Sequence, residues 1–117
     1  MKPILTLSAL LLSATFATAQ DYSGSYLVTG TNLDGSPYAG TAEITLTSEY
    51  TCEIVWTTGG STSTGICMRN GNAFAAGYEL NGAVGLVVYE IQADGAMNGA
   101  WTIAGKNAVG TEVLTPN

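Results

Sequence analysis

The sequence contains no histidine, only three basic residues and only two cysteines among its 117 residues. Histidine is the usual general base of Ser/His and Cys/His sites and the commonest metal ligand, so its absence argues against those chemistries. Two cysteines are too few for a structural zinc site. Because Lys2 lies in the leader described below, Arg69 and Lys106 face nine acidic residues, too few positive charges to neutralise a phosphate backbone. We therefore predict no catalytic residues, no metal, no cofactor and no nucleic-acid partner.

The first residues have the three parts of a secretory signal peptide. A positive start at 1–3 precedes an apolar stretch at 4–16 and a small-x-small cleavage signal, Ala17-Thr18-Ala19. The apolar stretch is shorter than the roughly 20 residues that a membrane-spanning helix needs, and no later segment is apolar enough for a span. We predict a signal peptide at 1–19, a single domain at 20–117, no membrane insertion, and a secreted or periplasmic location.

The two cysteines are Cys52 and Cys67, and their spacing forms no C-x-x-C redox motif. In an oxidising compartment such a pair is expected to form a disulfide. Gly59-Gly60 lies midway between them and predicts a hairpin in which Cys52 faces Cys67. Opposed residues of antiparallel strands have Cα atoms about 4.5 to 5.5 Å apart, which suits a disulfide. We therefore predict a Cys52–Cys67 bond.

The rest of the chain has the pattern of an all-β domain. From Tyr22 onward, apolar residues alternate with Thr, Ser and Glu, and Gly, Asn and Asp separate runs of about eight residues. No window has the periodicity of an amphipathic helix. The pattern predicts eight strands in an antiparallel up-and-down meander. The predicted strands are residues 22–30, 38–47, 50–57, 62–69, 72–80, 83–92, 96–104 and 109–115.

The turns between these strands predict their register, because loop length and glycine position fix which residues face each other. Together they place one set of bulky apolar side chains on a common face. The predicted turns are Asn70-Gly71 with Cys67 opposite Phe74, Asn81-Gly82 with Tyr78 opposite Gly85, and Ala93-Asp94-Gly95 with Val87 opposite Trp101. The common face contains Cys52, Ile54, Trp56, Cys67, Phe74, Tyr78, Val87, Tyr89, Ile91, Met97 and Trp101, extended by Tyr22, Tyr26, Val28, Tyr38, Ile44 and Leu46.

Several large side chains on this face lie opposite glycines, which gives a sheet room to coil. The expected pairs are Ile54 with Gly65, Tyr78 with Gly85, Tyr89 with Gly99 and, in a register that the longer first loop leaves open, Tyr26 with Gly40. We predict that the meander closes into a small barrel, which removes exposed sheet edges. The alternative is a two-sheet β-sandwich, because Val84, Leu86 and Val88 make the opposite face of one strand apolar too.

The predicted interior is rich in aromatic residues with polar tips. Barrels of this strand number either fill themselves with side chains or hold one small ligand. The rings therefore form either an ordinary core or a ligand site where apolar area and hydroxyl groups converge. The aromatic set is Tyr22, Tyr26, Tyr38, Tyr50, Trp56, Phe74, Tyr78, Tyr89 and Trp101. The candidate ligand-binding residues among them are Tyr38, Trp56, Tyr78 and Trp101.

Two other features are candidates for function. The longest predicted loop carries Leu33 and Pro37 at one barrel end, where binding residues on a rigid scaffold commonly lie, although the same residues can simply shape a turn. Glu43 and Glu53 lie on outward faces of neighbouring strands. They suit a weak cation site or a glycosidase pair, but nothing buries them, and we interpret them as solvated glutamates.

Four segments of the chain stand out as motifs: residues 51–56 (TCEIVW), 65–75 (GICMRNGNAFA), 85–89 (GLVVY) and 110–116 (GTEVLTP). They resemble segments of small secreted proteobacterial proteins labelled fibronectin-binding. The resemblance implies adhesion to an extracellular protein such as fibronectin. A weaker resemblance is to avidin-like and lipocalin barrels, with Gly24-Ser25-Tyr26 standing where their first strand carries Gly-x-Trp.

These observations favour a secreted, non-enzymatic binding protein, adhesin-like and fibronectin-binding. The first alternative is an extracytoplasmic carrier of a small apolar or aromatic ligand in the barrel mouth. A third is an enzyme that uses tyrosine and carboxylate groups.

Overall fold

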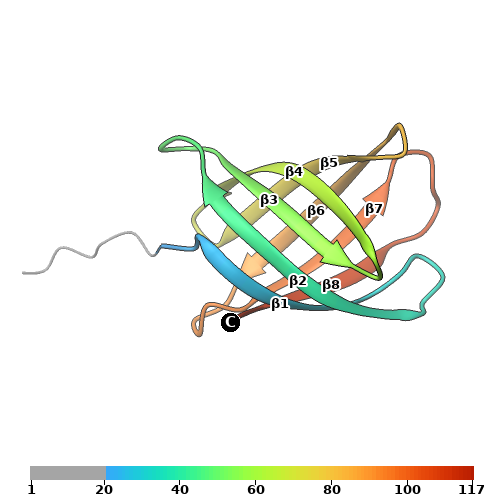
Figure 1. Cartoon of the computed structure of the whole chain (residues 1–117), viewed down its shortest axis with the longest axis horizontal. Helices are drawn as coiled ribbons and strands as arrows, with labels where there is room; N and C mark the ends of the chain where they lie inside the picture. Colours follow the sequence, from blue (N-terminus) through green and yellow to red (C-terminus); the bar gives the residue numbers. More distant parts are fainter. Residues whose placement is uncertain (1–20) are drawn as a thin grey trace, which may run out of the picture.

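The computed structural model describes residues 21–117, and the predicted signal peptide at 1–19 lies outside these residues. The chain forms eight antiparallel strands, each paired with the next, and the last strand pairs with the first to close a barrel (Figure 1). The predicted barrel is therefore confirmed, and the two-sheet alternative is wrong. The strands are β1 (Gly24–Thr31), β2 (Pro37–Leu46), β3 (Cys52–Thr58), β4 (Ser61–Asn70), β5 (Ala73–Leu80), β6 (Ala83–Ile91), β7 (Met97–Ile103) and β8 (Gly110–Pro116).

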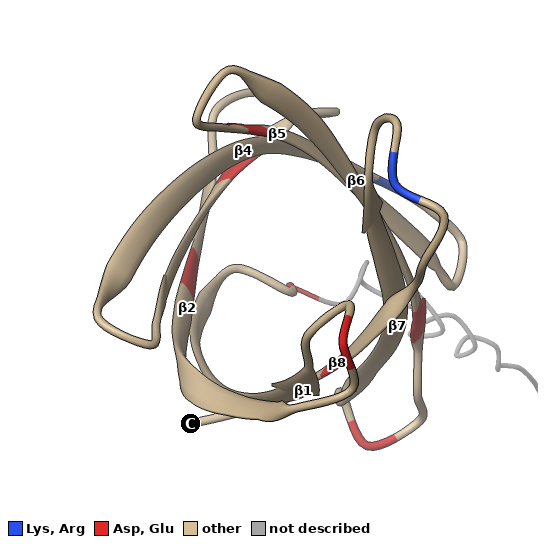
Figure 2. Cartoon of the chain, turned by 90° about the vertical axis from the view of Figure 1, so that its right-hand side faces the viewer, with Lys and Arg blue, Asp and Glu red and all other residues tan. Residues whose placement is uncertain are grey.

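Alternation of side chains between the lumen and the outside produces this architecture. In β6, Val87, Tyr89 and Ile91 are buried, whereas the alternate residues Leu86, Val88 and Glu90 are exposed. The end-on view in Figure 2 shows the strands as a continuous ring. Within residues 21–117 there is no helix with the length and apolar character of a membrane span.

The cysteine pairing follows the predicted register. Gly59 and Gly60 have φ angles of +56° and +82°, which suit the tight turn between β3 and β4. Cys52 and Cys67 therefore face each other with Cα atoms 4.9 Å apart, and they form a disulfide. This confirms the predicted bond. A disulfide is typical of an oxidising compartment outside the cytoplasm.

The turn between β4 and β5 is displaced by one residue from the prediction. Asn70 pairs with Ala73, so the two loop residues are Gly71 and Asn72 rather than Asn70 and Gly71. Gly71 has a φ of +61° at the first loop position, which a type II′ turn requires and which glycine adopts without strain. Cys67 consequently faces Ala76, and not Phe74 as predicted. The same side chains still face the lumen, because the pairing shifts by two residues.

Three further predictions about the interior are wrong. Tyr50 lies in the β2–β3 loop and is 71% exposed, and Leu46 at the end of β2 is also exposed because it lies at the barrel rim. Tyr26 faces Ala42, while Gly40 faces Val28, because a five-residue loop at 32–36 sets the β1–β2 register. The remaining aromatic residues of the predicted set are buried or partly buried against the core.

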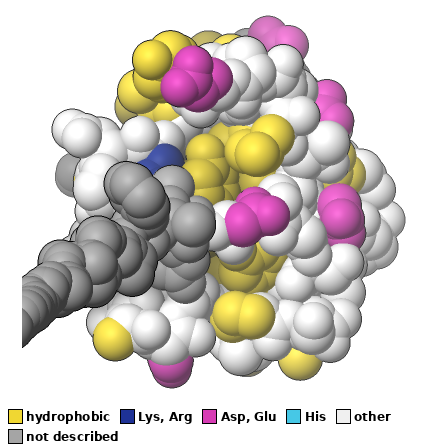
Figure 3. Space-filling model, turned by 90° about the vertical axis from the view of Figure 1, so that its left-hand side faces the viewer, with side chains coloured by type: hydrophobic (Ala, Val, Ile, Leu, Met, Phe, Trp, Pro, Cys, Tyr) yellow, Lys and Arg dark blue, Asp and Glu magenta, His cyan; other side chains and the backbone are white. Residues whose placement is uncertain are grey.

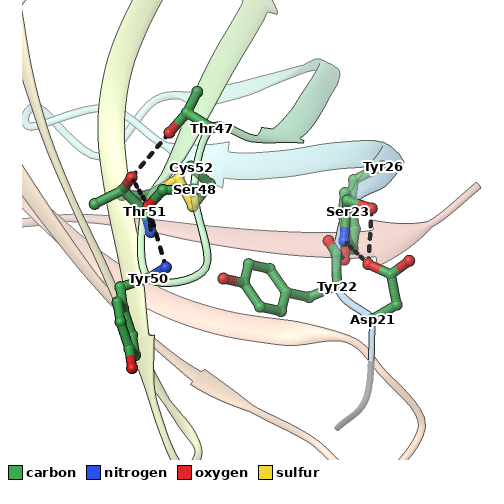
Figure 4. The surroundings of a disulfide bond; sticks show 10 residues. Asp21, Tyr22, Ser23, Tyr26, Thr47, Ser48, Tyr50, Thr51 and Cys52 are labelled. Carbon is green, nitrogen blue, oxygen red and sulfur yellow. Dashed lines mark hydrogen bonds between the residues drawn. A yellow bond between two sulfur atoms is a disulfide. The ribbon is translucent and has the colours of Figure 1, made fainter.

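Side chains fill the barrel at the end that holds the β2–β3, β4–β5 and β6–β7 connections. The Tyr22 ring meets the Phe74 ring edge-on at 5.3 Å between centroids, and Phe74 lies 5.8 Å from Tyr89. Tyr22 points from the segment before β1 toward the disulfide (Figure 4), and its carbonyl accepts a 2.6 Å hydrogen bond from the Tyr26 hydroxyl. Hydrophobic side chains gather at the centre of this end (Figure 3).

Candidate functional site

The opposite end of the barrel contains a pocket of about 340 Å³. It lies at the end where the β1–β2, β3–β4, β5–β6 and β7–β8 connections are found, which faces the viewer in Figure 2. Its lining combines aromatic rings, small hydroxyl side chains and one carboxylate. The lining residues are Asn32, Tyr38, Trp56, Thr58, Gly59, Ser61, Ser63, Tyr78, Leu80, Val87, Trp101 and Glu112.

Glu112 on β8 is the chemically distinctive residue of this lining, because it is 6% exposed yet carries a carboxyl group. Its Oε1 accepts a 2.6 Å hydrogen bond from the Tyr38 hydroxyl on β2. Its Oε2 accepts a 2.8 Å hydrogen bond from Trp56 Nε1 on β3, and a very short one from the Tyr89 hydroxyl on β6. Four strands thus meet at one carboxyl group. Buried polar groups need such partners, since an unsatisfied one is costly.

The tyrosine hydroxyls around Glu112 remain protonated well above neutral pH. Burial and the neighbouring Glu112 charge raise the pKa of Tyr78 to about 12. Burial raises the pKa of Tyr38 and of Tyr89 further, and the hydrogen bonds to Glu112 add to this effect. At neutral pH these hydroxyls therefore donate protons to hydrogen bonds and do not act as bases.

Two edge-to-face aromatic pairs belong to the pocket lining. Tyr38 and Trp101 have ring centroids 6.3 Å apart, and Trp56 and Tyr78 have centroids 5.2 Å apart. Glycines make room for these rings: a Cβ on Gly85 would collide with the Tyr78 ring. The aromatic pairs hold each other in place and present apolar surface beside the Glu112 carboxyl group.

The predicted ligand-binding residues divide into two groups. Tyr38, Trp56, Tyr78 and Trp101 all line the pocket, although they come from four different strands. Leu33 and Pro37 lie in or beside the β1–β2 loop and are not among the lining residues of this pocket. Leu33 is partly buried and Pro37 is exposed, so of the two only Pro37 is freely accessible at the surface of this loop.

Side-chain hydrogen bonds shape the β1–β2 loop. The backbone amide and the hydroxyl of Ser36 donate bonds of 2.9 and 2.6 Å to Asp34 Oδ1, and the backbone amide of Asn32 donates to the Ser36 carbonyl at 2.7 Å. The two bonds from Ser36 lower the pKa of Asp34 below its usual value. Asp34 is therefore accounted for by the turn, and a role of this loop in partner binding stays a prediction.

Glu112 is not among the site residues predicted from the sequence, although the sequence contains a signal for it. Glu112 shares its strand face with Gly110 and Leu114, both of which are buried. A charged residue in phase with buried neighbours is unusual, because charges are almost never buried without partners. The alternation predicts that the Glu112 side chain faces inward. It cannot predict the hydrogen-bond partners, because they come from β2, β3 and β6.

The outward carboxylates have simpler surroundings. Glu43 accepts a 2.6 Å hydrogen bond from the Ser25 hydroxyl, and both Glu43 and Glu53 are exposed. Across the part of the chain that the structure describes, no group of three or more His, Cys, Asp or Glu residues is placed to hold a metal ion.

Comparisons with known proteins support the fold but give no information about the site. No protein-family model and no curated protein matches the sequence. Among solved structures, the chain is similar to a de novo designed fluorescence-activating β-barrel, with a TM-score of 0.64 and 13% identity over 81% of this chain and 93% of the other. At this identity the similarity concerns the barrel architecture alone.

Proposed function

We propose that this protein is a non-enzymatic, secreted or periplasmic binding protein that holds a small ligand in the open end of its barrel. The observation that carries the proposal is the buried Glu112 carboxyl group in a pocket lined by Tyr38, Trp56, Tyr78 and Trp101. Ligand sites typically combine a mostly apolar lining with a few placed polar groups, in pockets of roughly 300 to 1,000 Å³. The volume of about 340 Å³ falls within that range.

The distribution of side chains supports a pocket at one end over a barrel filled throughout. Phe74, Tyr89 and the disulfide are fully buried in the interior, whereas at the pocket end Tyr38, Tyr78 and Trp101 are only partly buried. The structurally similar designed barrel is described as fluorescence-activating. That description supports the idea that a barrel of this architecture can accommodate a small molecule.

A binding experiment with a filled pocket tests this proposal. The neutral fluorophore N-phenyl-1-naphthylamine should bind the purified protein and show energy transfer from the pocket tryptophans. Ser63→Phe places a ring in the pocket lining and should abolish the signal. Thr64→Phe is the matched control, because Thr64 is exposed on the same strand and points outward. Equal signals from both variants, or none from the wild type, would contradict the proposal. Mass spectrometry of solvent extracts would identify a co-purified ligand.

A second candidate function is adhesion to an extracellular protein, and an exposed aliphatic patch favours it. Ile66, Met68, Leu86 and Val88 are between 52 and 67% exposed. They form two rows across the outside of the barrel, because Gly77 lies between Ile66 and Leu86, and Ala75 lies between Met68 and Val88. Exposed apolar patches of this kind commonly mark protein interaction sites.

The charges beside the aliphatic patch indicate what kind of partner fits it. Glu53 is the cross-strand neighbour of Ile66. Glu79 is the cross-strand neighbour of Val84, which lies next to Leu86 on the outer face of β6, at the edge of the patch. Both glutamates are exposed. A partner with an apolar centre and a basic rim is complementary to this surface, while a second acidic copy of this chain is repelled. We propose an extracellular protein with such a basic surface, with fibronectin as the case to test.

Surface plasmon resonance against immobilised fibronectin tests the adhesion candidate. The double variant Leu86→Thr/Val88→Thr should weaken binding, and the affinity should fall with added salt. Leu27→Thr is the matched control, since Leu27 is equally apolar and 48% exposed on β1, outside the patch. Absence of wild-type binding would exclude fibronectin as the partner. A wild-type dimer in light scattering that becomes monomeric in the double variant would show that a second copy of this chain covers the patch.

A further inference from the structure

We infer that the pocket recognises a cationic alkylammonium group, with Glu112 as the counter-charge and the aromatic rings as its walls. This inference rests on the proposed ligand-binding function and names the chemical class of the ligand. It draws on three independent features of the site: the electrostatics of Glu112, its remaining hydrogen-bonding capacity, and the identity of the surrounding side chains.

The charge of Glu112 has no basic side chain beside it in the pocket. The lining contains this one carboxylate and neither Lys nor Arg. The basic residues of the described segment 21–117 lie elsewhere: Arg69 donates a 2.7 Å hydrogen bond to the Gly71 carbonyl and lies over the Tyr22 ring, and Lys106 is exposed in the β7–β8 connection. The hydrogen-bond donors of Glu112 are all neutral groups. A cation in the pocket therefore gains Coulomb attraction, and an anion is repelled.

The carboxylate also has capacity for another interaction. Its two oxygens offer about four lone-pair directions, and three are used by Tyr38, Trp56 and Tyr89. The unfilled direction belongs to Oε1, which within residues 21–117 accepts a hydrogen bond from Tyr38 alone. An ammonium N–H can donate there, and a quaternary ammonium can approach by charge alone.

The aromatic walls favour the same class of ligand. The negative faces of Trp, Tyr and Phe rings attract cations, and clusters of such rings are a recurrent way to bind quaternary ammonium groups. The lining contains two tryptophans and two tyrosines from four strands. A neutral apolar ligand would use these rings but would leave the buried Glu112 carboxylate without a counter-charge.

Competition with a matched pair of small molecules tests the inference. Choline and 3,3-dimethylbutan-1-ol have the same shape, and only choline is charged. Choline should displace N-phenyl-1-naphthylamine from the wild type at a concentration roughly tenfold or more below that of the alcohol. Glu112→Gln should remove most of this advantage while leaving the alcohol's displacement concentration nearly unchanged.

The possible results separate this inference from the proposed function. If the fluorophore binds but choline and the alcohol compete equally, the pocket is a ligand site and the cationic class is wrong. If the fluorophore does not bind and calorimetry detects no choline binding, both are wrong.

If Glu112→Gln does not fold, Tyr78→Leu replaces it, because the structure shows no hydrogen bond from Tyr78 to Glu112 within residues 21–117. Tyr78→Leu should weaken choline binding about fivefold, and Tyr50→Leu, on the exposed loop at the other end, should not. Equal choline binding by both variants would overturn the inference.

Discussion

Trp56 and Glu112 are 56 positions apart in the chain, yet the indole Nε1 donates a 2.8 Å hydrogen bond to the Glu112 carboxyl group inside the barrel. Trp56 lies on β3 and Glu112 on β8, and these two strands are not neighbours in the barrel. The contact crosses the lumen. It ties β3 to β8, the strand that closes the barrel three positions away around the ring, and it positions the carboxyl group in the pocket.

Replacing Trp56 with Phe should destabilise the protein by about 1 to 3 kcal/mol, because a buried carboxyl group loses a donor while most of the apolar surface is retained. Chemical denaturation followed by circular dichroism measures the change. Trp101→Phe is the control, since Trp101 is less buried and its Nε1 donates a 3.3 Å hydrogen bond to the Thr111 backbone carbonyl rather than to the Glu112 carboxyl group. If the two variants lose equal stability, the Glu112 network does not stabilise the barrel as proposed.

Gly85→Ala should be destabilising by about 1 to 3 kcal/mol and should weaken probe binding, because the new methyl group collides with the Tyr78 ring in the pocket wall. Gly77→Ala on the neighbouring strand is the matched control. A Cβ there meets its nearest neighbour, Leu86, at an ordinary 3.7 Å. Thermal unfolding of both variants, with fluorophore binding, checks the difference. A harmless Gly85→Ala would show that Tyr78 moves freely and that the ring is not held in place.

Stability should fall as the pH rises above about 10, where tyrosines of an unfolded chain begin to lose protons. The pKa of Tyr78 is raised to about 12, and those of Tyr38 and Tyr89 are raised as well. Between pH 10 and 12 the unfolded state therefore binds fewer protons than the folded state, which favours unfolding. Denaturation midpoints at pH 8, 10 and 11 measure the loss. Tyr78→Phe should make the decrease in stability with pH shallower. An unchanged decrease would mean that groups other than Tyr78 cause it.

Reduction of the Cys52–Cys67 bond should cost on the order of 3 kcal/mol, the expected contribution of closing a loop of about 15 residues. The bond joins neighbouring strands that are already paired along their length. The barrel should therefore survive reduction with a lower melting temperature and an unchanged far-ultraviolet spectrum. Thiol titration of oxidised protein is the accompanying check, and two reactive thiols before reduction would contradict the bond itself.

Local sequence determined the strands and most of their pairing. Gly59-Gly60 and Asn81-Gly82 dictate tight turns, because these residues tolerate positive φ, and alternation fixes which side chains face inward. From these two rules the cysteines were correctly placed opposite each other. The Asn70-Gly71-Asn72 segment was less decisive, because both Asn-Gly and Gly-Asn can form a two-residue loop.

Only the tertiary structure decided how the interior is used. Closure pairs β1 with β8 and brings Glu112 to Tyr38, Trp56 and Tyr89, which no local pattern relates. Closure also packs Tyr22 against Phe74 at one end and leaves a pocket beside Glu112 at the other. The physical reason is that side-chain alternation is a property of each strand, whereas a cavity depends on how inward side chains from strands all around the ring share one volume.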